Sequence, residues 1–327
     1  MTVHDVAQHL PPSLQANQRL GDWLSILATG VVEVRSGKVE LGQGVLTALA
    51  QIVAEELDIG VDRVRMTPAV TGSSPDEGYT AGSLSIQHSG DALRTVGAEA
   101  RAIYLAAAAA RWQVSPDGLT VDDGTVRAPD GRTTTYWDLA DDRLLDRPAT
   151  GVAEPKSEAG YRIVGTNVPR VDLPDKLAAR PRFAHDLSPA GLVYGRIVRP
   201  PSRQARLAHL HTAPTLALSG VITVVRDGNF LGVIAEREEV ALAAAERLRA
   251  DVTWEEHPTL PDEDQLAAFL MSAPAETSVL ADTRTAEGPV AAAKSYESTY
   301  HRPYLAHAAM GPSSATALMT KDDGVRL

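Results

Sequence analysis

The stretch Gly37–Gly44, "GKVELGQG", leads directly into "VLTALAQIVAEEL", in which apolar residues recur at helical spacing from Val45 onward. The residues just before it, "GVVEVRSGKVEL" at 30–41, predict two short extended segments around a turn at Ser36. Gly60 stands where the helix is expected to stop. This order predicts a strand, a glycine-rich turn and a helix, followed by a further strand in "RVRMTPAV".

Gln43 lies between two glycines at the start of this helix. Glycines let backbone N–H groups approach an anion, and a helix N-terminus adds partial positive charge. Gln43 could offer an amide N–H to a bound oxygen. The stretch is neither a phosphate-binding loop of the Walker type, because Gln43 replaces the lysine, nor a dinucleotide fingerprint, because Thr47 replaces the third glycine. The alternative is a tight turn with an exposed glutamine.

A second loop repeats this arrangement at 71–85, "TGSSPDEGYTAGSLS". It precedes a long predicted helix at 89–112, for which Ser89 is the candidate N-cap. The loop brings small and hydroxyl-bearing residues to a helix start, so two such loops could hold two phosphates. The alternative is a capped, flexible loop. The residues concerned are Gly82, Ser83 and Ser85.

Composition limits the function classes. The chain has 327 residues, enough for two domains, and a net charge of −11, which argues against a nucleic-acid-binding surface. It has no cysteine, so it supplies no thiolate for an iron–sulfur cluster or a zinc site. Because neither an export signal nor a membrane span is visible in the sequence, we expect a cytoplasmic protein.

The other chemistry-bearing residues favour structural interpretations. His209 and His211 have no helical i, i+4 partner, nor do His301 and His307, so a histidine metal site is not expected. A Gly-x-Ser-x-Gly nucleophile elbow is absent from the sequence. The carboxylate pairs on predicted helices are most simply solvated surface. These pairs are Glu55-Glu56 and Glu238-Glu239.

The second half of the chain predicts another domain. Residues 141–160 are polar and contain two prolines, as in a linker. Beyond them, "LVYGRIVRPP", "GVITVV", "FLGVIAER" and "DVTWEE" predict strands, and "EEVALAAAERLRA" predicts an amphipathic helix. From residue 257 a helix near 263–271 and a strand-like stretch at 292–310 follow.

The stretches "GKVELGQGVLTALAQIVAEEL" and "TAGSLSIQHSGDALR" resemble the molybdenum-cofactor subunit of the xanthine dehydrogenase and aldehyde oxidase family, in its isoquinoline 1-oxidoreductase and nicotinate dehydrogenase branch. The stretch "NVPRVDLPDKLAARPRFAHDLSPAGLVYGRIVRPP" resembles the opening of that family's α/β hammerhead domain, and "YHRPYLAHAAMGPSSATA" is similar to the segment after it. These stretches follow the family's order along nearly the whole chain, but they correspond only to the N-terminal half of the family's subunit.

The resemblance implies an α+β fold in four parts. Residues 1–145 would form an N-terminal molybdopterin-binding segment, 146–161 a linker and 162–256 the α/β hammerhead domain. Residues 257–327 would begin a further cofactor-binding region that another chain completes.

The resemblance also implies a cofactor, molybdopterin cytosine dinucleotide carrying molybdenum. Gln43 would hydrogen-bond an oxo ligand of the metal. Gly42 and Gly44 would give the pterin and metal close access to the backbone. The residues expected along the pterin or its phosphates are Thr80, Gly82, Ser83 and Ser85.

The activity that the resemblance implies is hydroxylation of an N-heteroaromatic compound or an aldehyde, with water as the oxygen source. The base would be a glutamate in a Gly-x-Gly-Glu-like segment, which this sequence lacks, so a partner chain would carry it. Electrons would leave through a small [2Fe–2S] subunit and then a FAD or cytochrome (haem) subunit. Export to the periplasm with such a partner is also compatible with the resemblance.

Two departures keep other interpretations open. The chain has Met310-Gly311-Pro312 where the family commonly has Met-Glu-Pro, and it lacks the base segment. We expect a naturally split subunit, with a truncated product as the alternative. A noncatalytic scaffold or a cofactor-insertion and assembly protein of the same fold is the alternative function.

Overall fold

The structure is a computed structural model that describes residues 10–181, 183–257, 259–281, 293–303, 305–306, 308–311, 313–320 and 324–326. It divides into two compact units, Met1–Arg182 (unit 1) and Phe183–Leu327 (unit 2). Helices and strands occur in both units, as expected for an α+β protein. His307 and Pro312 lie outside the described residues.

Unit 1 contains the strand, turn and helix that the opening stretch predicts. Its three-stranded sheet has the order β1-β2-β3, in which β1 and β2 are antiparallel and β2 and β3 are parallel. Parallel neighbours need a crossover connection, and helix α4 provides it. The elements are β1 (Leu24–Ile26), β2 (Val32–Val34), α4 (Val45–Leu57) and β3 (Val64–Met66).

Two details of this unit differ from the prediction. The second extended segment is absent, because residues 35–40 form no strand and instead hydrogen-bond to a distant loop. Helix α4 ends before Gly60, with Asp58 in the left-handed conformation at φ 53°. Asp58 ends the helix because its backbone N–H bonds back to the carbonyls of Ala54 and Glu55, a C-cap more usually formed by glycine.

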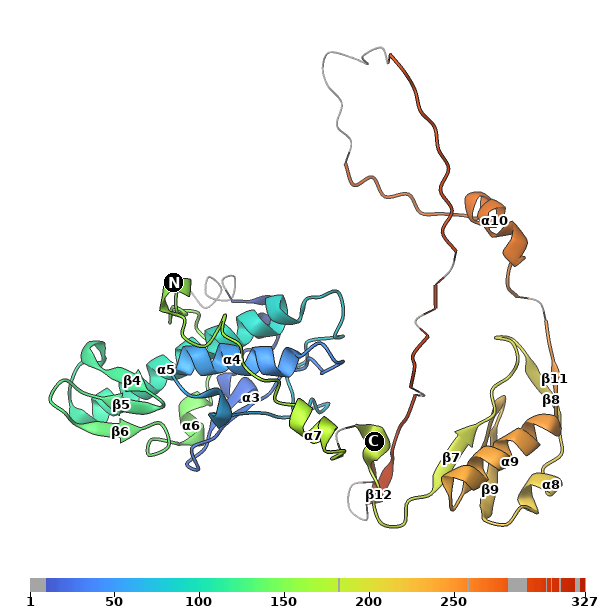
Figure 1. Cartoon of the computed structure of the whole chain (residues 1–327), viewed down its shortest axis with the longest axis horizontal. Coiled ribbons are helices and arrows are strands. Elements are labelled where there is room, and N and C mark those ends of the chain that lie inside the picture. The colour runs from blue at the N-terminus through green and yellow to red at the C-terminus, as the bar shows by residue number, and fades with distance from the viewer. Residues whose placement is uncertain are drawn as a thin grey trace. The chain divides into compact units, whose positions relative to one another are not determined.

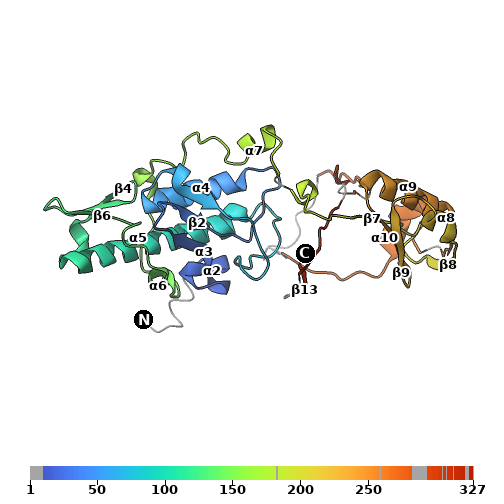
Figure 2. The same cartoon turned by 90° about the horizontal axis from the view of Figure 1, so that it is seen from below.

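The long helix α5 (Asp91–Trp112) packs beside α4 (Figure 1). Gly97 permits this close approach, because a Cβ there would lie 2.8 Å from the Cβ of Glu56. Seen from below, α4 lies on one side of α5, and the short helices α2 (Pro12–Ala16) and α3 (Leu20–Trp23) lie on the other (Figure 2). Their apolar faces form one core cluster, whose largest fully buried side chains include Trp23, Leu49, Leu57, Leu93, Tyr104 and Tyr136.

The start of α5 corrects the predicted cap. A π-helical turn, Ile86–Gly90, runs directly into α5, so Ser89 lies inside the helical run and caps nothing. Ser89 is fully buried, and its hydroxyl lies 2.8 Å from the hydroxyl of Ser36. The residue therefore ties the helix to the end of β2.

After α5, the chain forms a small antiparallel meander of three strands in the order β4-β5-β6. A short helix α6 (Asp142–Leu145) follows, and the chain then returns along α4 and α5 to helix α7 (Leu173–Leu177). Residues 146–161, the expected linker, lie within unit 1. The strands are β4 (Thr120–Asp122), β5 (Thr125–Arg127) and β6 (Thr133–Thr135).

The carboxylates of α4 and α5 hold this returning segment, which corrects the prediction that Glu55 and Glu56 are solvated. Both glutamates are almost completely buried. Glu55 Oε2 accepts backbone N–H groups of residues 162–164 at 2.6–3.0 Å, and Glu99 accepts those of Thr150 and Gly151. Buried carboxylates are stable only when paired in this way. The predicted exposure of Glu238 and Glu239 is confirmed.

Unit 2 contains the predicted strands and amphipathic helix. It has an antiparallel sheet of order β7-β10-β9 and a separate antiparallel pair β11-β8, and helix α9 (Glu238–Ala250) packs on β7 and β10. Alternate residues of β10, Leu231 and Val233, join Leu248 of α9 in a separate core. The strands are β7 (Tyr194–Ile197), β8 (Arg206–Leu210), β9 (Val221–Asp227), β10 (Phe230–Ala235) and β11 (Val252–Glu255). Helix α8 (Ala213–Leu216) precedes β9.

The last part of the chain has little regular structure among its described residues. Helix α10 (Leu266–Ser272) confirms the helix predicted near 263–271. The strand-like stretch at 292–310 is in no strand wherever it is described. Strands β12 (Leu318–Thr320) and β13 (Gly324–Arg326) then pair antiparallel. Among the described residues, the structure has no helix long and apolar enough to cross a membrane.

Candidate cofactor site

The turn between β2 and α4 brings the predicted glycines and Gln43 to an exposed position. Gly42 has φ +107° and Gly44 has φ +81°, a region of backbone conformation that favours glycine. Gly44 is the residue just before α4, and Gln43 is exposed beside it. A Cβ added to Gly42 would meet no heavy atom within 4 Å, so this glycine faces open space.

Gln43 also makes hydrogen bonds inside the turn. Its Oε1 accepts the backbone N–H of Leu41 at 2.5 Å, and its Nε2 donates to the carbonyl of Val39 at 3.1 Å. A primary amide has two N–H hydrogens, and only one of them has a partner among the described residues, so one donor of Gln43 remains for a ligand. The side chain is thus held by the loop while one N–H stays available.

The backbone N–H groups expected to receive an anion are already bonded to Glu40. Its Oε1 accepts the N–H of Gly42 and the N–H of Gly44, each at 2.8 Å, and its Oε2 lies 3.4 Å from the nitrogen of Leu46. The Glu40 side chain is only 10% exposed. A carboxylate is favourable at a helix N-terminus because of the helix dipole. An internal anion therefore occupies the place where an external one was expected.

The second predicted loop joins the first through residues 77–80. Lys38, which is 3% exposed, donates from Nζ to the carbonyls of Glu77 at 2.6 Å and Tyr79 at 3.1 Å. The backbone N–H of Val39 donates to the hydroxyl of Thr80 at 3.0 Å. Thr80 is thereby placed next to the first loop.

The base of the first loop is held by the same segment. Glu77 Oε2 accepts the backbone N–H of Gly37 at 2.8 Å and the hydroxyl of Ser36 at 3.0 Å. At Gly37 any side chain would collide, because a Cβ would lie 2.4 Å from the carbonyl oxygen of Pro75. The two loops are therefore packed backbone to backbone at this point.

The remaining predicted residues lie farther along the second loop. Gly82 and Ser83 are exposed and both have positive φ, 68° and 58°. Ser83 in this conformation is uncommon for a residue with a Cβ. Ser85 comes immediately before the π-helical turn, so the loop does deliver it to a helix start. Within the described residues, no hydrogen bond joins these three residues to Gly42, Gln43 or Gly44.

Sequence reasoning missed the charged residues that hold the loop. The position of Glu40 in the sequence could have predicted this contact. A carboxylate two residues before a glycine turn at a helix start can accept the backbone N–H groups of that turn. No sequence pattern near Arg170 indicates that it contacts the turn. Its Nη1 donates to the carbonyl of Gly42 at 2.7 Å, from 128 residues away in sequence.

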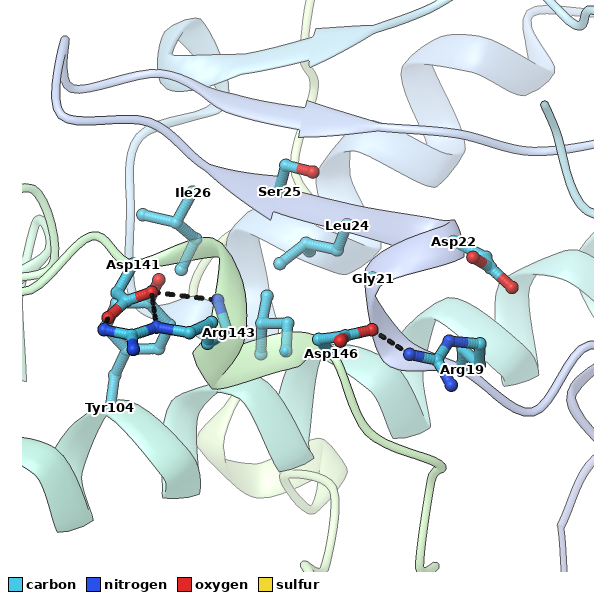
Figure 3. Close-up of a pocket in the computed structure, with 11 residues that line it drawn as sticks. Arg19, Gly21, Asp22, Leu24, Ser25, Ile26, Tyr104, Asp141, Arg143 and Asp146 are labelled. Atoms are coloured by element: carbon cyan, nitrogen blue, oxygen red, sulfur yellow. Dashed lines mark hydrogen bonds and ion pairs between the residues drawn. The ribbon is translucent and has the colours of Figure 1, made fainter.

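A cavity of unit 1 lies away from these two loops. A hollow of about 290 Å³ opens between β1, α3, α5 and α6, with an ion pair at each side and Leu24 and Ile26 between them (Figure 3). The pairs are Arg19 with Asp146, and Arg143 with Asp141 at 2.8 Å. None of the predicted site residues lines this cavity. Among the described residues, no group of three or more metal-ligating side chains is found.

Comparison with known proteins identifies the domain family to which these two loops belong. Residues 3–164 match the molybdopterin cofactor-binding domain. This part of the chain belongs to that family. The match covers both loops, α4 and α5, so the resemblance seen in the sequence is confirmed.

Two relatives of this chain are named as enzyme subunits. The chain is 34% identical to a nicotinate dehydrogenase subunit of Pseudomonas putida, over 96% of the chain and 27% of that protein. It is 29% identical to the beta subunit of isoquinoline 1-oxidoreductase of Brevundimonas diminuta, over 72% of the chain and 35% of that protein. The chain thus spans about a quarter to a third of these relatives.

A solved structure also matches. It is the reconstituted CO dehydrogenase from Oligotropha carboxidovorans, with 30% sequence identity, a TM-score of 0.33, and coverage of 36% of this chain and 15% of that chain.

Proposed function

We propose that this chain supplies part of the molybdopterin site of a molybdenum hydroxylase that oxidises an N-heteroaromatic compound or an aldehyde with water as the oxygen source. The observation that carries the proposal is the exposed Gln43 on a glycine-bounded turn inside the matched cofactor-binding domain. Both relatives are named after N-heteroaromatic compounds, nicotinate and isoquinoline, which supports that substrate class.

The residues present fit such a cofactor. Gly42 borders open space, and Gln43 keeps one amide N–H for an oxygen of the group. When bound, the molybdenum centre would supply the two-electron redox chemistry. Gly42 and Gly44 would let the pterin approach the backbone. The residues proposed along the pterin or the phosphates of a cytosine dinucleotide are Thr80, Gly82, Ser83 and Ser85.

The bonds of Glu40 restrict how the cofactor is held. The N–H groups of Gly42 and Gly44 are used by this carboxylate, so they do not serve a phosphate while Glu40 stays in place. Recognition at the first loop then depends on the Gln43 side chain. Phosphate binding falls to the second loop, where Gly82 and Ser83 are exposed.

The other parts of the enzyme would come from partner chains. We propose that residues 162–256 form the α/β hammerhead domain and that 257–327 begin a further cofactor-binding region, with the catalytic glutamate outside these 327 residues. A small [2Fe–2S] subunit and a FAD or haem subunit would remove the electrons. The absence of cysteine from the sequence supports this division, because this chain cannot ligate the clusters itself.

The experiment is to purify the chain with its partner subunits, measure molybdenum, and release the nucleotide by acid. Molybdenum and cytidine monophosphate are expected. A complex that contains no molybdenum would instead support the scaffold or assembly protein.

Gln43 is tested in the same complex. Because Gln43 is exposed, Gln43→Ala is expected to lower turnover at least about tenfold without loss of assembly. Gln204→Ala, an exposed glutamine in unit 2, is the matched control and should keep full turnover. Equal turnover in the Gln43 variant and the control would reject the role of Gln43.

A further inference from the structure

Arg170 reaches the Gly42–Gly44 turn from outside the matched domain, which ends at residue 164. Its Nη1 donates to the carbonyl of Gly42 at 2.7 Å, and its Nη2 lies 3.4 Å from Glu40 Oε1. The guanidinium also packs over Gly44, where a Cβ would meet it at 3.7–3.8 Å. One side chain therefore touches the residues on both sides of Gln43.

Arg170 is itself held in place. The buried carboxylate of Asp172 accepts its Nε at 3.0 Å and its Nη2 at 2.7 Å, a two-point contact that fixes the plane of the guanidinium. Lys176 Nζ donates to the same carboxylate at 2.5 Å. Hydrogen bonds from Arg170, working against burial, hold the pKa of Asp172 well below its usual range, so the carboxylate stays charged.

The next residue along the chain fixes the position of this segment. The backbone N–H of Val171 donates to the hydroxyl of Thr47, which is in the first turn of α4, at 3.0 Å. The Arg170–Asp172 segment is thus attached to the same helix whose N-terminus carries the turn. Helix, turn and arginine form one connected unit.

We propose that Arg170 is a positioning residue which, together with Glu40, fixes the Gly42–Gly44 turn and so orients Gln43. Glycines at positive φ lose much conformational freedom when ordered, so a turn with two of them needs external contacts. Glu40 holds the N–H groups of Gly42 and Gly44, and Arg170 holds the Gly42 carbonyl. The cofactor-facing role of Gln43 rests on the proposed function, whereas the fixing of the turn does not.

The test is hydrogen exchange by mass spectrometry on the full 327-residue chain without cofactor. In Arg170→Gln, the amides of residues 42–46 are expected to exchange about tenfold faster, because charged hydrogen bonds are lost. The matched control is Arg180→Gln, which removes an ion pair with Asp175 in the same segment and does not touch the turn. Its exchange at 42–46 should equal that of the wild type.

A second variant keeps the test decisive. Arg170→Lys can still donate to the Gly42 carbonyl but cannot bond Asp172 at two points, so it should exchange at a rate between wild type and Arg170→Gln. Amides of α5 in each variant report whether unit 1 remains folded. Wild-type exchange at 42–46 in a folded Arg170→Gln chain would overturn the proposal.

Molybdenum content of the purified complex separates the two proposals. Loss of retained molybdenum in Arg170→Gln, with retention in Arg180→Gln, supports an effect of the turn on the cofactor. Equal retention and equal turnover in both variants would overturn the orienting role of Arg170. A wild-type complex free of molybdenum would refute the proposed function, and the exchange result would still stand.

Discussion

The adjacent buried glutamates Glu55 and Glu56 of α4 give the sharpest test of the packing. Their pKa values are shifted in opposite directions, down for Glu55 and up for Glu56. Burial raises the pKa of the Glu55 carboxyl, but three backbone N–H donors and Lys156 outweigh it, and the net pKa lies below the ordinary 4.5. At Glu56, burial dominates over the Lys156 N–H and Arg94, so the pKa is raised. Replacing each glutamate by glutamine removes the charge with little change in volume.

The expected size of the Glu55→Gln effect follows from its contacts. The carboxylate accepts N–H groups at 2.8, 2.6 and 3.0 Å, and its other oxygen lies 3.3 Å from Lys156 Nζ. Hydrogen bonds to a charged group contribute about 1 kcal/mol more than neutral ones. Three of them give about 3 kcal/mol, and relief of carboxylate desolvation reduces this to about 2 kcal/mol near neutral pH. Glu56→Gln should change the free energy of unfolding by less than about 1 kcal/mol.

The pH dependence separates the two variants. A carboxylate with a lowered pKa stabilises fully above its unfolded value of 4.5, and this is lost as pH falls through the lower folded pKa. The difference between wild type and Glu55→Gln should therefore shrink below about pH 4.5. For Glu56 the folded pKa is higher, so the wild type should gain stability relative to Glu56→Gln as pH falls from neutral through that pKa.

The assay is urea unfolding of each variant from about pH 7 down to about pH 3, followed by tryptophan fluorescence. Three of the four tryptophans, Trp23, Trp112 and Trp137, lie in unit 1 and report on it. Equal unfolding free energies for Glu55→Gln and wild type at neutral pH would refute the reasoning. So would parallel pH dependences of the two glutamine variants.

Three further predictions concern burial and backbone geometry. Tyr136→Phe should leave unit 1 equally stable or stabilise it by up to about 1 kcal/mol, since the buried hydroxyl has no hydrogen-bond partner among the described residues; urea unfolding measures this. Gly37→Ala should destabilise unit 1 by more than about 2 kcal/mol, because its Cβ would lie 2.4 Å from the Pro75 carbonyl oxygen, and a wild-type melting temperature would contradict this. Leu248→Ala should cost about 2–5 kcal/mol in unit 2 and leave hydrogen exchange in α5 unchanged, because the two cores are separate clusters.

Much of the local structure could be predicted from the sequence. Apolar spacing located α4, α5 and α9, and alternation with β-branched residues located β9 and β10. The predicted cap at Ser89 was wrong, because a π-helical turn extends the helix before it and buries the hydroxyl against Ser36. The missing strand after β2 has a similar cause, since Gly37 and Val39 donate to Glu77 and Thr80 instead of to a neighbouring strand.

The sequence by itself determined that a glycine-bounded Gln43 stands at the start of a helix, and that a second loop leads into another helix. Such features depend on residues within a few positions of one another. Whether Glu55 and Glu56 are buried depends on where residues 156–164 return, about a hundred positions later. The hydrogen bond from Arg170 to the Gly42 carbonyl likewise joins residues 128 positions apart in the sequence. Periodicity describes one element at a time, so only the tertiary structure decided which charges are buried, what partners they have, and which anion occupies the turn.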